Sequence, residues 1–158
     1  GIVLPDGSLF GEGVKTAIKK KLLEECNLHT IIRLPQGVFN PYAGVNTNLL
    51  FFEKSSSTKE VWFYELPLPE GLRQYTKGRP IQHEEFGSVR KWWNDRQSNS
   101  HAWKVSIAEI QERNYNLDFK NPKRQETVNH KEPKELLQVI NEKEKQISYI
   151  MNEIKNIL

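Results

Sequence analysis

Short apolar runs separated by turn-forming residues dominate the first 65 residues of the chain. The apolar positions gather in the segments 2–4, 29–34, 46–53 and 61–65. The first run is closed at once by PDG and the second by PQG. Runs of this length between such turns are typical of strands, so the pattern predicts four strands.

The segment 13–26 has a helical period instead. Its apolar residues recur at spacings of three and four, with lysines around them (Val14, Ala17, Ile18, Leu22 and Leu23). Strand, helix and strand in this order predict a crossover unit with parallel first and second strands. The third strand follows a loop without a helix, which is compatible with an antiparallel return beside the second. We expect the fourth strand at an edge of the sheet.

Beyond residue 65 the periodicity weakens. Residues 66–125 contain four prolines and a tryptophan cluster (Trp92, Trp93 and Trp103), which predicts an irregular extension with short helices wrapped on the sheet. A polar stretch from Asn121 to Pro133 follows and is typical of a linker.

A clear amphipathic pattern returns after Pro133, a residue that suits a first helical turn. Apolar side chains follow a heptad-like seam that only Lys143 interrupts (Leu136, Ile140, Ile147, Ile150, Ile154 and Ile157). This predicts a long helix. It either packs against another chain or folds back on its own core, and the pattern alone leaves both open.

Composition and charge narrow the class of protein. The chain is 37% hydrophobic and 27% charged, which is ordinary for a globular protein. It has no apolar run of about 18 residues, so we expect no membrane span. One cysteine, Cys26, excludes an internal disulfide and is compatible with a reducing cytoplasm.

The net charge of +3 comes from the middle of the chain. Residues 54–125 hold 13 basic and 9 acidic side chains, whereas the segments on either side are balanced or slightly acidic. This excess suits a surface that faces phosphate, and it equally suits an ordinary solvated face of mixed charge.

Most familiar catalytic patterns are absent from the sequence. FGEG has two glycines before a helix, but Thr16 stands where a dinucleotide-binding fingerprint needs its third glycine. The four histidines have no metal-ligand spacing, so we expect no metal site.

Two aromatic-rich stretches remain as candidate sites. Phe39 and Tyr42 fall in a loop between strands, where an aromatic ring either stacks on a base or fills the core. The stretches KWWNDR and RNYNLDFKNP mix aromatics with amides and cations (Lys91, Arg96, Arg113 and Lys120). That mixture suits nucleic acid or a polar protein interface, and it is also found in satellite hydrophobic clusters under long loops.

Taken together and in order, IVLPDGSLFGEG, LEECNLHTIIRLPQGVFNPYAGVNTNLLFFEK, KWW and RNYNLDFKNP resemble the modification (M) subunit of type I restriction-modification systems. That subunit is an adenine-N6 DNA methyltransferase that uses S-adenosylmethionine. The resemblance runs from residue 1 to about residue 122. It implies an α/β fold, the C-terminal part of a Rossmann-like methyltransferase sheet that is mixed, with its last strand antiparallel. The divisions expected are 1–65 for this half sheet, 66–125 for the extension and 133–158 for a coiled-coil-like helix.

In that family the cofactor loop and the catalytic (N/D)-P-P-(F/Y) motif precede the IVLPDG strand. This sequence contains neither, and its nearest stretch, NPYA at 40–43, has one proline and follows the second strand. The resemblance therefore implies a C-terminal portion with no catalytic residue of its own. S-adenosylmethionine is expected to bind the full-length enzyme, and we expect this chain alone neither to bind it nor to methylate DNA.

The resemblance also implies roles for side chains that are present. In GVFNPYAGVNTNLLFF, Phe39 occupies the place of the aromatic residue that stacks on a flipped adenine, with Tyr42 as the alternative. The expected partners are DNA, the specificity (S) subunit and, through it, a second M subunit and the restriction subunit. The final helix would dock on S through Ile140, Ile147, Ile150 and Ile154. The alternative function is a non-catalytic module that binds DNA or protein.

Overall fold

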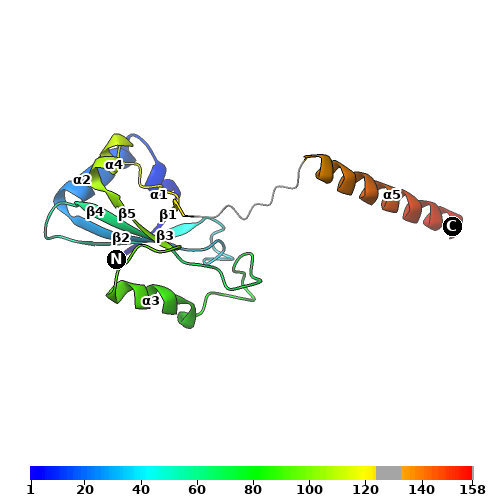
Figure 1. Cartoon of the computed structure of the whole chain (residues 1–158), viewed down its shortest axis with the longest axis horizontal. Helices are drawn as coiled ribbons and strands as arrows, with labels where there is room; N and C mark the ends of the chain where they lie inside the picture. The colour runs from blue at the N-terminus through cyan, green and yellow to red at the C-terminus, as the bar shows by residue number, and fades with distance from the viewer. Residues whose placement is uncertain (124–132, 158) are drawn as a thin grey trace. The chain divides into compact units, whose positions relative to one another are not determined.

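A computed structural model describes residues 1–123 and 133–157 of the chain. The chain divides into two compact units, Gly1–Arg124 and Gln125–Leu158. The first unit is built on a five-stranded mixed sheet with the order β1-β3-β2-β4-β5 (Figure 1). Its strands are β1 (Ile2–Pro5), β2 (Asn27–Arg33), β3 (Thr47–Glu53), β4 (Glu60–Glu65) and β5 (Ala102–Ser106).

The strand directions agree with the crossover predicted from the sequence. β3 lies between β1 and β2 and is antiparallel to both, so β1 and β2 point the same way. The helix α2 (Val14–Glu25) connects these two strands, as expected. β4 pairs in parallel with β2, from Thr30 opposite Trp62 to Arg33 opposite Glu65. Three strands therefore share one direction.

The expected edge position of the fourth strand is wrong. β4 lies between β2 and β5, and β5 pairs with it antiparallel from Glu60 opposite Ser106 to Tyr64 opposite Ala102. The apolar residues of β4 are buried on both faces of the sheet. Val61 and Phe63 belong to one core, and Tyr64 belongs to the other. A strand buried on both faces is typical of a central position.

β5 itself lies inside the stretch that was predicted to be irregular. The strand has only five residues, and its adjacent Ala102 and Trp103 are both buried, on opposite faces of the sheet. Apolar and polar residues alternate only over 103–106, with Trp103 and Val105 buried and Lys104 and Ser106 exposed, and a run of about four residues is the shortest that indicates a strand.

Helices cover both faces of the sheet, as Figure 1 shows. On one face, α1 (Gly7–Phe10), α2 and α4 (Ile107–Glu112) contribute to a core that includes Leu9, Leu23 and Ile110. On the other face, the short η1 (His83–Phe86) leads into α3 (Gly87–Asn94), which packs Val89 and Trp92 on the sheet.

The predicted final helix is present as α5, Pro133–Ile157, in the second unit. Its described apolar side chains are largely exposed, with Leu137 and Ile140 at 58% and Ile147 at 61%. None of the described helices combines the length and the apolar character needed to cross a bilayer.

Candidate functional site at the carboxyl ends of the strands

Because β1, β2 and β4 point the same way, their carboxyl ends meet at one edge of the sheet. The turn at Asp6, the loop 34–46 and the loop 66–82 all leave from this edge. The segment 113–123, which follows α4, also reaches it through contacts with Arg33. In open α/β sheets, ligands bind at the carboxyl ends of the strands, so this edge is the candidate site.

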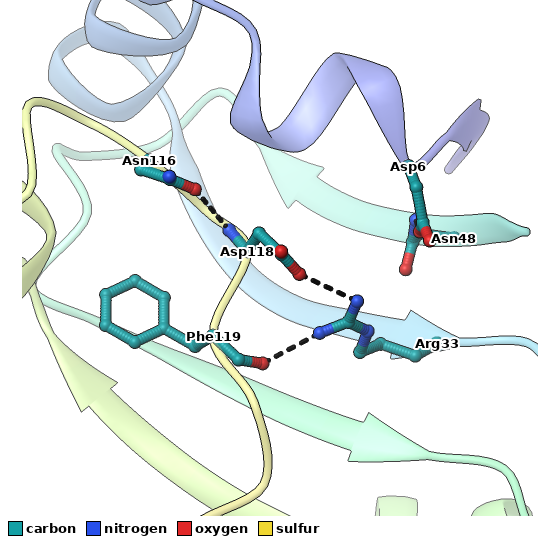
Figure 2. A network of polar contacts seen from close by, with 6 residues as sticks. All are labelled: Asp6, Arg33, Asn48, Asn116, Asp118 and Phe119. Atoms are coloured by element: carbon teal, nitrogen blue, oxygen red, sulfur yellow. Dashed lines mark hydrogen bonds and ion pairs between the residues drawn. The ribbon is translucent and has the colours of Figure 1, made fainter.

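Arg33, the last residue of β2, ties the segment 113–123 to the sheet (Figure 2). Its Nη2 lies 2.8 Å from Oδ1 of Asp118, and its Nη1 donates to the carbonyl oxygen of Phe119 at 2.8 Å. The backbone N–H of Asp118 donates to Oδ1 of Asn116 at 2.8 Å. Figure 2 shows Asp118 and Phe119 both facing the one guanidinium group, so a single side chain fixes two residues of the segment.

A second polar contact fixes the turn after β1. Nδ2 of Asn48, a fully buried residue of β3, donates to Oδ1 of Asp6 at 2.6 Å. Among the described residues no donor reaches Oδ1 of Asn48. The N–H of Asp6 also donates to the carbonyl of Asn46 at 3.0 Å. The turn after β1 and the end of the loop 34–46 are thus held together.

The two aromatic residues predicted to face a base are both accessible on the loop 34–46. Phe39 is 38% exposed and Tyr42 is 94% exposed. The carbonyl of Phe39 accepts hydrogen bonds from the N–H groups of Tyr42 and Ala43, at 2.8 and 3.0 Å, which closes a tight turn. Phe39 is the less exposed of the two rings, and neither fills the core.

The four cations predicted to contact DNA do not share one surface. Arg113 and Lys120 are exposed on the segment 113–123, and the guanidinium carbon of Arg113 lies 4.5 Å from the centre of the Phe119 ring. Lys91 is exposed on α3, across the sheet from α2 and α4. Their predicted role in DNA binding stays a prediction.

Arg96 has a packed environment instead of an open one. Its guanidinium carbon lies 4.4 Å from the centre of the Trp93 ring, and its Nη1 lies 3.4 Å from Nδ1 of His29. Burial lowers the pKa of Arg96, and burial followed by the charge of Arg96 lowers the pKa of His29. Since His29 stands near the amino end of β2, Arg96 lies at the sheet edge opposite the candidate site.

The glycine pair of FGEG is not an open phosphate cradle. It follows α1 and not a strand, and lysine side chains of α2 already occupy the turn. Nζ of Lys15 donates to the carbonyl of Gly7 at 2.9 Å, and Nζ of Lys19 to those of Leu9 and Gly11 at 2.7 and 3.0 Å. The described residues therefore do not fit S-adenosylmethionine at this turn. They also contain no group of three or more histidine, cysteine or acidic residues placed to hold a metal ion.

Sequence reasoning did not single out Arg33, Asn48 or Asp118. The available signal was weak: Arg33 follows two isoleucines at the end of β2, and Asn48 is the second residue of β3. On α5, the predicted docking residues Ile140, Ile147 and Ile150 are exposed, and the side chain of Ile154 lies outside the described residues.

Comparison with known proteins decides the family. The family model described as "N-6 DNA Methylase" matches residues 1–131. The chain belongs to the N-6 DNA methylase family. The match includes the whole sheet and the polar contacts at its carboxyl edge, so the candidate site is part of the methylase fold.

Curated methylases from enteric bacteria are similar to this chain. The methylase subunit of the type I restriction enzyme EcoEI from Escherichia coli is 58% identical over 136 residues, which are 82% of this chain and 28% of that protein. The EcoKI methylase subunit from E. coli strain K12 is 45% identical over 75 residues, 41% of this chain and 14% of that protein. The chain therefore spans less than a third of the length of these relatives.

Solved structures give the same result for the fold. A modification subunit of a putative type I restriction enzyme from Vibrio vulnificus YJ016 matches with a TM-score of 0.75 and 44% identity, over 81% of this chain and 28% of that one. A chain from a study of complex assembly and conformational transition of the type I R-M system matches with a TM-score of 0.75 and 40% identity. That match covers 99% of this methylase chain and 34% of the other.

Proposed function

We propose that this chain is the base-facing and assembly part of a type I DNA adenine-N6 methylase, which transfers a methyl group from S-adenosylmethionine to a flipped adenine. The observation that carries the proposal is the family match over residues 1–131, which includes a loop that presents Phe39 and Tyr42 at the carboxyl edge of the sheet. The fold is that of the family, and the accessible aromatics are on a loop at the edge where open α/β sheets generally bind ligands, which supports the proposal.

The chemistry of adenine explains why this part alone is expected to be inactive. The lone pair of the N6 amino group is delocalised into the ring and is a poor nucleophile. The family motif supplies carbonyl acceptors for both amino hydrogens, and this sequence does not contain that motif. S-adenosylmethionine supplies the electrophilic methyl group in the full-length enzyme. The role left for this chain is to hold the flipped base and the DNA around it.

Phe39 is the proposed platform for the flipped base. Stacking of a base on an aromatic ring contributes roughly 1–3 kcal/mol, which corresponds to a factor of roughly 5 to 150 in affinity. In the full-length methylase, Phe39→Ala should lower kcat/KM for plasmid DNA by a factor in this range, and Tyr42→Ala should have a smaller effect. Incorporation of labelled methyl groups from S-adenosylmethionine measures both. Equal rates for Phe39→Ala and the parent enzyme would remove Phe39 from this role.

DNA binding is proposed to extend from this loop to Arg113 and Lys120, which are exposed on the segment 113–123 that Arg33 ties to the end of β2. Lys91 and Arg96 remain further candidates, at the positions described above. Phosphate contacts by such cations give affinity that falls with salt and is independent of sequence. Neutralising a residue that contacts DNA should therefore reduce the salt dependence of binding.

The helix α5 is proposed to dock on the specificity subunit through its exposed isoleucines. The match that covers 99% of the chain comes from a type I system studied for complex assembly, which supports an assembly role. Ile147→Glu should abolish co-purification with the specificity subunit. Gln138→Glu adds the same charge nine residues away, half a helical turn round the axis, and should leave co-purification intact. A stable complex with Ile147→Glu would place the interface elsewhere.

A calorimetric titration separates this proposal from that of a self-sufficient enzyme. The purified chain should give no heat with S-adenosylmethionine, whereas the full-length methylase should bind it and label N6 of adenine in unmethylated plasmid DNA. Stoichiometric binding by the chain alone, or methylation at another atom, would contradict the proposal.

A further inference from the structure

A small hairpin stands beside the base-facing loop. It comprises residues 75–79, in the loop after β4, and we call it the Lys77 hairpin. Thr76 and Arg79 pair across it, with N–H to carbonyl distances of 3.2 and 3.1 Å, and the N–H of Arg79 also lies 3.2 Å from Oγ1 of Thr76. Lys77 and Gly78 form the tip. The loops after β2 and β4 lie at the same end of the sheet in Figure 1.

The base of the Lys77 hairpin is fixed to the loop that carries Phe39. Tyr75 is fully buried, its N–H donates to the carbonyl of Gln36, and its carbonyl accepts from Nδ2 of Asn40, both at 3.0 Å. Gly37, with φ of +84°, allows this approach, since a Cβ there would collide with the carbonyl oxygen of Tyr75. These contacts lie on either side of Phe39 in the sequence, so the hairpin is tied to the backbone of the loop that carries this ring.

The tip of the hairpin offers a positive charge and unused donors. Nη2 of Arg79 lies 2.8 Å from Oε1 of Glu85, so this cation is neutralised at the base of the hairpin. Lys77 and the nearby Arg73 are exposed, and within the described part of the chain neither forms an ion pair. The backbone N–H groups of Lys77 and Gly78 likewise donate to no described atom. A cation beside free backbone N–H groups is a typical phosphate ligand set.

We propose that the Lys77 hairpin binds the DNA backbone beside the flipped base, through the Lys77 ammonium and the tip N–H groups. The proposal rests on the proposed function of the loop 34–46. Extruding a base rotates its nucleotide out of the stack, so the phosphates next to it must be held in place. A cationic hairpin locked to the base-stacking loop can hold a phosphate at a set distance from the captured base. Arg73 supplies a second charge on the same loop.

The experiment uses the full-length methylase and a labelled duplex of about 30 base pairs of arbitrary sequence, titrated across a range of salt. Lys77→Gln removes one cation, and Lys77→Arg retains it. Lys54→Gln is the matched control, because Lys54 is exposed in the turn between β3 and β4, at the other end of the sheet. Circular dichroism checks that each variant is folded.

We expect Lys77→Gln to reduce the slope of log K against log salt by about 0.9, the value for one lost phosphate contact. The ratio of the parent's binding constant to that of Lys77→Gln should fall by roughly 3.5-fold between about 50 and 200 mM salt. Lys77→Arg and Lys54→Gln should keep the parent slope. With plasmid DNA as substrate, Lys77→Gln should raise KM and leave kcat near the parent value.

Two results would overturn the proposal. One is an unchanged slope for Lys77→Gln while plasmid methylation by the parent enzyme is normal, which leaves the proposed function standing. The other is an unchanged slope with weaker binding of the specificity subunit, which would make the hairpin a protein contact. A parent enzyme that binds DNA without methylating adenine would instead contradict the proposed function.

Discussion

Replacing Arg33 with methionine should loosen the segment 113–123 from the sheet. The change removes two hydrogen bonds from a charged donor, each 2.8 Å long, to Asp118 and to the carbonyl of Phe119. The side chains of Arg33 and Asp118 are only 18% and 32% exposed, so water replaces these contacts poorly. Hydrogen bonds to charged groups contribute about 1.5–3 kcal/mol, and we expect the local opening free energy to fall by about 2 kcal/mol.

Hydrogen exchange followed by mass spectrometry measures this opening in the full-length methylase. A loss of about 2 kcal/mol corresponds to roughly 30-fold faster exchange in the segment, including the N–H of Leu117, which donates to the carbonyl of Leu9 at 3.0 Å. Lys21→Met is the control. Its ion pair with Glu25 spans 3.9 Å between side chains that are 71% and 58% exposed, so its loss should not change exchange in the segment.

A double-mutant cycle refines the test. Asp118→Asn alone removes the charge of the acceptor, and its combination with Arg33→Met should cost less than the sum of the two single changes, because no unpaired carboxylate remains. Unchanged exchange in Arg33→Met would show that Arg33 does not hold the segment and would refute the reasoning. Strictly additive effects would show instead that the ion pair with Asp118 does not contribute to holding it.

Three further predictions concern the core and the base-facing loop. Phe63→Ala, at a fully buried ring that packs against those of Trp103 and Phe119, should lower the free energy of unfolding in urea by about 3–5 kcal/mol. The hydrogen bond from the backbone N–H of Gln82 holds the pKa of Glu85 below its usual value. The ionised carboxylate therefore stabilises the folded state fully at neutral pH, and this stabilisation is lost as the pH falls through the lowered pKa. Hydrogen exchange in the residues 75–79, corrected for intrinsic rates, should rise on acidification in the parent and be high already at neutral pH in Glu85→Gln. Gly37→Ala should raise exchange on both sides of the contact with Tyr75, and no change there would mean that this contact is not formed.

The regular elements were predictable where their pattern is local. α2 and the four predicted strands have clear periods and turn signals, and they form within a few residues of the predicted bounds. β5 was missed because its alternation of apolar and polar residues covers only positions 103–106, within a stretch that contains prolines and several tryptophans and has no longer period. The position of β4 between two neighbours depends on β5, so the same omission produced the wrong edge.

The candidate site was predictable only in part. Phe39 and Tyr42 could be identified because they are aromatic residues in a loop between two strands, and both are accessible in the structure. The bridge from Arg33 to Asp118 joins residues 85 positions apart, and no local pattern indicates such a partner. Likewise, nothing in the sequence around Tyr75 indicates that its backbone fastens a distant loop. Long-range pairing follows from the whole topology, which short patterns do not specify.

The free side of β1 has a practical consequence for handling the protein. Among the described strands β1 has a neighbour on one side only, and its sequence, IVLP, carries no charge. Ile2 and Val3 are 43% and 48% exposed. An uncharged edge strand of this kind templates the addition of a strand from another molecule. A light-scattering mass that grows with the concentration of the isolated chain, and that is unaltered by Ile147→Glu, would therefore report self-association through β1, and Val3→Lys should suppress it.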